Sequence, residues 1–463
     1  MLMRLVQKEV LLHLRETRFF WVAGLCCALV LMGLVLMGLE YQKRVEDYQT
    51  SLASEQRYLH SVNENSTVLQ QVRELTNERG IYAFRRPQVL EPLAGGLTGK
   101  VPAQIHVLDR ASWSRQANDT HYRNPLFVLF PRPDFVFVVG SILSLVALFF
   151  TFDSVCGEKQ AGTLRVMFSA GISRDRVLIG KWLGAMTTLA VPFLLATGLG
   201  LAVLGVVNGE PLTTDIAVRL GMIVLVSLVY LSLFVTMGIA ISVFTRRPSS
   251  SLLICLAAWI GVSILLPNLL ASLGTMVDPI PTFQQIRLQK RGIDLERGEA
   301  FARIQERLTK GEITEEQRLS FRTEASEKAG EEKTRIDLEY RRQVERQTGV
   351  SIGLSRLSPL ASRTFSAMEL ADTGLSFYRN AYTGFEQYRK SFREYSANLK
   401  QAAAAEEIKS DWLQDDKVPV LRFHASKFEQ SLAAITTEFM ILVVVQLVLF
   451  ALAFVRFLKY DVR

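Results

Sequence analysis

Six long apolar runs constrain this chain more than any other feature of its sequence. A helix needs roughly 20 mostly apolar residues to cross the hydrocarbon core of a bilayer. Runs of about this length or longer occupy residues 19–39, 135–152, 177–207, 218–244, 250–271 and 433–457. They predict a mainly α-helical, polytopic membrane protein with six transmembrane helices. Because 49% of the residues are hydrophobic and 21% are charged, the spans must alternate with polar segments.

The first apolar run could be confused with a cleavable signal peptide, because Arg15 and Arg18 precede it. The run is too long for the apolar core of a signal peptide, and residues 38–40 form a poor cleavage site. We therefore interpret residues 19–39 as a retained span.

The basic residues of the short loops predict the orientation of the spans. Four segments fall on one side of the membrane if the spans alternate, and their basic residues are Arg4, Lys8, Arg15 and Arg18; Lys159, Arg165, Arg174 and Arg176; Arg246 and Arg247; and Arg456, Lys459 and Arg463. That side is predicted to be the cytoplasm, with both termini in it. The net charge of +8 is thus mainly a topology signal. No recognition motif for nucleic acid accompanies it, so no nucleic-acid partner is expected.

Two long insertions, residues 40–134 and 272–432, are predicted on the extracytoplasmic side. The first begins with a helical pattern that Gly80 ends, and from residue 81 it becomes rich in Pro, Gly and β-formers. The second is predicted to be helical, with one charged helix over 283–308, a break at Gly311, and a second helix that ends near Gly349. Neither insertion contains cysteine, so both must fold without disulfides.

An aromatic heptad pattern follows Thr373 and Gly374 within the second insertion. Its members are Tyr378, Phe385, Phe392 and Leu399, with Ala381, Tyr388, Tyr395 and Ala402 three residues after each. Such a seam is typical of a helix packed within a domain or across a dimer, and we prefer this interpretation to an aromatic substrate track. Just before it, residues 357–370 predict a short amphipathic helix at the outer membrane surface.

The polar loop between the second and third spans, residues 153–176, carries a helix of its own. Gly162 interrupts the preceding turn, Thr163 can cap a helix over residues 164–170, and Gly171 suits its C-terminal end. We expect Leu164, Val166, Met167 and Phe168 to be partly exposed on this helix. Two interpretations remain: the helix docks into an apolar groove of a partner, or it anchors in the lipid headgroups.

The segment before the first span, residues 1–18, is predicted to be an amphipathic helix along the cytoplasmic leaflet. Met3, Val6, Val10 and Leu14 recur at helical spacing, while basic residues lie on another face. The alternative is a simple N-terminal extension of the first span.

The loop closely resembles that of type-2 ATP-binding-cassette (ABC) permeases. The resemblance lies in Glu158-x-x-x-Gly162-Thr163-Leu164, followed by Ser173-Arg174 and Gly180-Lys181. Lys8 and Glu9, with Arg15 and Arg18, look like the elbow helix of that family. The large insertions, Ser358-Pro359 and the C-terminal residues 456–463 resemble a branch related to the permeases of gliding-motility transporters.

The resemblance implies that the short helix is a coupling helix, which lies in a cleft of a separate ATPase subunit. Glu158, Arg174 and Arg176 would make charged contacts around that cleft, and Leu164, Met167 and Phe168 would fill it, with Gly162 and Thr163 starting the helix. The implied function is an exporter in the bacterial cytoplasmic (inner) membrane. Its other half would be the same chain or a paralogue, and its extracytoplasmic partner an envelope protein. ATP and magnesium would bind to the partner ATPase, and no cofactor or metal to this chain.

Three polar residues within the spans are candidates for the translocation path, namely Glu438, Gln446 and Asn268. Glu438 is shallow enough to reach the lipid headgroups, and we prefer that anchoring interpretation. Gln446 is more typical of a hydrogen bond between helices.

Two other functional classes compete with a permease. A membrane enzyme would need a catalytic motif, and neither a His-Glu-x-x-His zinc pair nor a Gly-x-Ser-x-Gly elbow is present. A structural or sensing protein would use the spans only as anchors and bind an envelope partner through its helical insertion. The pattern of the 153–176 loop disfavours this second alternative.

Overall fold

The computed structural model confirms a mainly α-helical chain with six helices long and apolar enough to span a membrane. It describes residues 2–15, 17–65, 68–75, 79–107, 134–208, 213–277, 279–404, 418–421, 423 and 425–459. The six helices occupy 19–62, 135–161, 174–205, 214–244, 248–277 and 428–458, and each predicted span overlaps one of them. The chain forms two compact units, residues 1–263 with 362–463 and residues 264–361.

The first unit contains five of the spans and the loops that join them. Its helices are α1 (Leu2–Arg15), α2 (Thr17–Asn65), α3 (Val68–Arg73), α5 (Phe135–Phe137), α6 (Ser144–Thr151), α7 (Cys156–Ala161), α8 (Thr163–Ser169), α9 (Arg174–Asn208), α10 (Thr214–Phe244), α16 (Leu375–Ala404) and α17 (Phe428–Leu458). A π-helical turn, Val138–Leu143, joins α5 to α6. Helix α11 (Pro248–Ile260) begins the fifth span in this unit.

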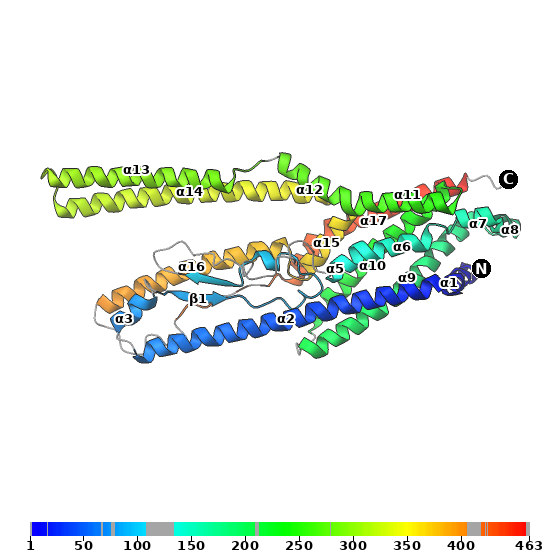
Figure 1. Cartoon of the computed structure of the whole chain (residues 1–463), viewed down its shortest axis with the longest axis horizontal. Helices are drawn as coiled ribbons and strands as arrows, with labels where there is room; N and C mark the ends of the chain where they lie inside the picture. Colours follow the sequence, from blue (N-terminus) through cyan, green and yellow to red (C-terminus); the bar gives the residue numbers. More distant parts are fainter. Residues whose placement is uncertain are drawn as a thin grey trace. The chain divides into compact units, whose positions relative to one another are not determined.

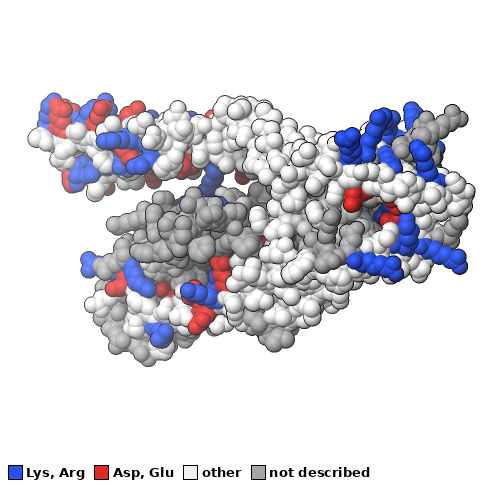
Figure 2. Space-filling view, turned by 45° about the vertical axis from the view of Figure 1, so that its right-hand side comes forward, with Lys and Arg blue, Asp and Glu red and all other residues white. Residues whose placement is uncertain are grey.

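Helices α1, α2 and α9 pack closely at glycine positions of α9. Gly180 faces Leu5, Gly184 faces Glu9, and Gly200 faces Leu34 of α2. A Cβ would contact Leu5 tightly at position 180 and would collide with Glu9 at position 184 and with Leu34 at position 200. Helix α1 is therefore packed against the protein along one face. Figure 1 places α1, α7, α8 and the end of α17 at the same end of the unit. Figure 2 shows Lys and Arg gathered at that end, as the predicted cytoplasmic face requires.

Beyond the spans, parts of both insertions fold together into one lobe, which we define as residues 55–107 and 375–404. Strands β1 (Ile81–Phe84) and β2 (Gln104–Val107) form an antiparallel pair in which Ile81 lies opposite Val107. They share a core with α2, α3 and α16 that contains Leu59, Val62, Val72, Leu75, Ile105, Phe385, Tyr388, Phe392 and Leu399. The heptad pattern therefore lines a core within the domain.

The second unit contains the end of the fifth span, α12 (Leu266–Val277), followed by a helical hairpin formed by α13 (Phe283–Thr309) and α14 (Glu315–Ser355). Thr314 and Gln317 form a capping box at the start of α14, and Gly311 has the positive φ of 75° that the turn requires. Helix α14 ends at Ser355, six residues beyond the predicted end, because Gly349 and Gly353 are accommodated within the helix. The range 272–432, expected to form one domain, is thus divided between two units.

Helix α15 (Pro359–Leu370) has the predicted start but not the predicted environment. Its residues Ser362, Arg363, Ser366, Ala367 and Leu370 are all buried. The expectation of a helix lying on the outer membrane surface is therefore wrong. The sequence pattern misled because small side chains such as Ser and Ala allow close packing on a face that is polar by composition.

Candidate functional site

The 153–176 loop contains two short helices that two left-handed glycines delimit. Helix α7 ends at Gly162 and α8 ends just before Gly171, and both glycines have φ of 74°. The predicted short helix is present. Gly162, not Thr163, is its N-cap residue, and the Thr163 hydroxyl instead donates to the carbonyl oxygen of Glu158 at 3.4 Å. A side chain at either glycine would be strained by the positive φ.

The apolar side chains of α8 divide between the protein interior and the surface. Leu164 is buried, with 1% of its surface exposed, so the expectation that it is partly exposed is wrong. Met167 and Phe168 are half-buried, as expected. The Phe168 ring packs 6.0 Å from the Phe457 ring, and the Met167 sulfur accepts from Lys8 Nζ at 3.6 Å. Val166 is the exposed apolar residue of the helix, with 69% of its surface free.

The start of the loop is anchored to the end of α10. The backbone amides of Val155 and Cys156 both donate to Ser242 Oγ at 3.0 Å. Lys159 Nζ donates to the carbonyl oxygen of Val243 at 2.7 Å. Because buried N–H groups are bound by a fixed hydroxyl, α7 is held in place on the spans.

A four-residue ion cluster joins the loop to α1 and α9. Lys181 Nζ lies 2.9 Å from Glu158 Oε1 and 3.2 Å from Glu9 Oε1. Lys8 Nζ lies 3.2 Å from the same Glu158 oxygen and 3.6 Å from Glu9 Oε1. Burial opposes the charge of Lys8, but Glu158 and Glu9 together raise its pKa above the ordinary value. The side chains of Lys181 and Glu9 are 3% and 9% exposed, so the centre of the cluster is shielded from water.

This cluster brings together two residues that were predicted for separate reasons. Glu158 is predicted to make charged contacts around the ATPase cleft, and Glu9 is predicted in the elbow helix. Both bind Lys181, a residue whose contribution the sequence pattern did not reveal. The signal was present in the sequence, since Lys181 is a cation at the very start of an apolar span and needs a partner there.

The remaining basic residues of the predicted site lie around the loop. Arg174 donates to the carbonyl oxygen of Leu458 and lies 5.5 Å from the Phe168 ring centre. Arg15 and Arg176 are exposed, while the side chain of Arg18 lies outside the described residues. Arg174 thus joins α8 and α9 to the end of α17.

The three candidates for the translocation path are not brought together in one unit. Glu438 and Gln446 lie on α17, whereas Asn268 lies on α12 in the second unit and donates to the carbonyl oxygen of Ile264 at 2.8 Å. Glu438 is only 4% exposed, so it does not reach the headgroups as expected. Gln446 Nε2 donates to Thr236 Oγ1 at 2.7 Å, which confirms a hydrogen bond between helices.

The Thr236 hydroxyl is a shared acceptor, because Trp182 Nε1 also donates to it at 2.9 Å. We expect Thr236→Val to lower the thermal unfolding midpoint in nanodiscs more than Gln446→Leu does, since the valine leaves the donors of Trp182 and Gln446 without their acceptor. Single hydrogen bonds of this kind contribute on the order of 1 kcal/mol in membranes. Equal midpoints for the two variants would contradict the shared role.

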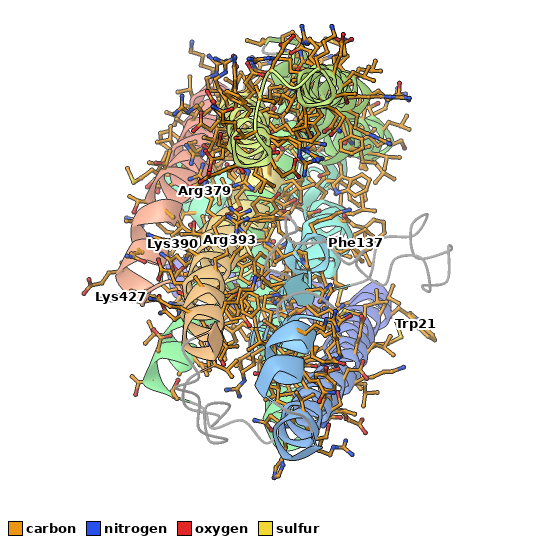
Figure 3. The ribbon with its side chains drawn as sticks, turned by 90° about the vertical axis from the view of Figure 1, so that its left-hand side faces the viewer. Trp21, Phe137, Arg379, Lys390, Arg393 and Lys427 are labelled. Carbon is orange, nitrogen blue, oxygen red and sulfur yellow. The ribbon has the colours of Figure 1, made fainter. Side chains whose placement is uncertain are left out.

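The lobe and the residue before α17 together carry a set of basic side chains that sequence reasoning did not single out. Arg379, Lys390 and Arg393 project from α16, and Lys427 precedes α17 (Figure 3). All four are exposed. Among the exposed large hydrophobic residues of the described chain, none lies on α16.

No group of three or more His, Cys, Asp or Glu residues in the described part of the chain could hold a metal ion. The four cysteines, Cys26, Cys27, Cys156 and Cys255, are free thiols. What the structure provides is six spans and an anchored loop with an exposed apolar residue.

Comparison with known families decides the class of the protein. The model of the ABC-2 family of transporter proteins matches residues 3–462. The chain belongs to this family. It is therefore a permease, the membrane component of an ABC transporter, and as such has no catalytic site of its own. No curated protein matches the sequence of this ABC-2 permease.

Proposed function

We propose that this ABC-2 permease is an exporter subunit that couples ATP hydrolysis by a separate ATPase to transport. The observation that carries the proposal is the α7–α8 loop. It is anchored to the spans, and its Val166 side chain is exposed on the protein surface. ATP and magnesium belong to the partner ATPase. The membrane is a bacterial cytoplasmic membrane, and the second permease half is the same chain or a paralogue.

The contacts of the loop support a specific mechanism of coupling. A push on α8 acts on α1 and α9 through the ion cluster, on α10 through Ser242, and on α17 through Phe168 and Arg174. Packed helices with fixed polar contacts move as units. Closure of two ATPase subunits would thereby rearrange the spans that the loop contacts. The translocation path would then open alternately to the two sides of the membrane.

Purification of the full chain with an ABC ATPase from the same genome tests the proposal. We expect a stable complex in lipid nanodiscs, with ATP hydrolysis that depends on the permease. Failure of every ABC ATPase of that genome to bind would overturn the coupling role. It would favour the alternative of a membrane-anchored structural or sensing component that binds an envelope partner.

A further inference from the structure

Two buried arginines hold α15 against the spans. Arg363 is completely buried, and its guanidinium donates to the carbonyl oxygen of Val136 and, at 3.3 Å, to Ser227 Oγ. It lies 6.0 Å from the Phe135 ring centre and 5.7 Å from that of Tyr230. A single side chain of α15 thus binds the beginning of the second span and the middle of the fourth.

Arg219 makes a second connection from the fourth span. It is 4% exposed, and it donates to the carbonyl oxygens of Leu370 at 3.2 Å and Ser426 at 2.5 Å and to Ser431 Oγ at 3.1 Å. The end of α15 is therefore tied to α10 and to the start of α17. Charge-assisted hydrogen bonds of this kind are among the stronger polar contacts of a protein.

The same segment is tied to the lobe on its other side. The Thr373 hydroxyl donates to the carbonyl oxygen of Ala94 at 2.7 Å, and the amide of Leu97 donates to the Thr373 carbonyl oxygen at 2.8 Å. Gly96 has φ of 48°, and a Cβ at this position would collide with the Thr373 carbonyl oxygen. The close approach of the two backbones thus requires glycine.

Helix α16 is joined stiffly to α15. Glu369 Oε1 accepts from the amides of Leu375 at 2.7 Å and Ser376 at 3.2 Å, which are first-turn amides of α16. On the opposite side of the lobe, α2 runs without interruption from the first span into the lobe core. Among the described residues, the lobe is thereby attached to the spans through α2 and through the segment between α15 and α16 (Figure 1). Hydrogen bonds from Gly95 to Asp134 and from Asn380 to Ser426 add to these attachments.

We propose that residues 363–376 form a positioning junction that carries ATP-driven movement of the spans to the lobe. Resting on the proposed function, this makes the lobe a driven part of the transporter. These attachments matter because a domain tethered by one flexible linker would move independently of the spans. Because the lobe is attached in this way, a rearrangement of the spans either reorients the lobe or distorts the contact between residues 94–97 of the lobe and Thr373.

Hydrogen exchange of the full permease–ATPase complex in nanodiscs tests the junction. We compare the nucleotide-free complex with the complex trapped by ATP and vanadate. In the wild type we expect exchange to change in the α7–α8 peptide and also, by about tenfold, in peptides covering 90–100 and 369–380. A response in the loop without one in the lobe would overturn the junction and leave the proposed function standing. Absence of a response in both peptides would overturn both.

Variants of the junction sharpen the test. Gly96→Ala separates the lobe from Thr373 without touching a buried arginine, and Ser227→Ala removes one acceptor of Arg363. We expect both to keep the nucleotide response of the loop and to lose or weaken that of the lobe. Arg389→Gln is the matched control, because Arg389 pairs with Glu386 on α16 outside the junction. A lobe response in Gly96→Ala equal to that of the wild type would refute the proposal.

Discussion

Replacement of Lys181 with methionine is expected to destabilise the permease by about 3–5 kcal/mol, the usual cost of breaking a buried ion pair from one side. The change leaves Glu9 and Glu158 facing each other with Lys8 as their remaining cation, and Lys8 is 41% exposed. The measurement is thermal unfolding in nanodiscs, together with accessibility of the α7–α8 loop to protease.

Two further variants test whether charge balance holds the ion cluster together. Lys8→Met should cost much less, because a half-exposed cation is screened by water. The double variant Lys181→Met with Glu9→Gln should recover most of the lost stability, since it leaves one cation and one anion. If the double variant were as unstable as the single one, the cluster would not be held together by charge balance.

The spans and several helix ends could be predicted because their signals are local. Length and hydropathy identify the spans, and the Thr314–Gln317 capping box and the positive φ at Gly80 and Gly311 follow from residue types at fixed spacing. The heptad pattern of α16 likewise identified a buried face. Each of these signals lies within a few turns of one helix, so no knowledge of neighbouring helices was needed.

The environment of the candidate site could not be predicted in the same way. Helix α8 has only seven residues, and its buried side depends on α1 and α17, which are distant in sequence. Lys181 lies 172 positions from Glu9, and Arg363 lies 227 positions from Val136. Pairings over such separations follow from tertiary packing, which residue types and periodicity do not encode.

Substitution of Val166 with aspartate is expected to weaken binding of the ATPase at least tenfold, about 1.4 kcal/mol. Val166 is the exposed apolar residue of α8, and a carboxylate there would lose its hydration when a partner covers the helix. Because the side chain is free in the permease alone, the thermal unfolding midpoint should stay near that of the wild type. Affinity is measured by titrating the purified ATPase onto the permease in nanodiscs.

Phe168→Ala provides the contrasting variant on the same helix. It removes the ring that packs against Phe457 and beneath Arg174, so we expect a lower unfolding midpoint as its first effect. Val166→Thr, which keeps the branched shape, should bind the ATPase nearly as well as the wild type does. Together the three variants distinguish a surface that contacts the ATPase from residues that only hold α8 in place. Unchanged affinity in Val166→Asp would mean that coupling uses another face of the loop, beginning with the exposed Arg165 and Ser169.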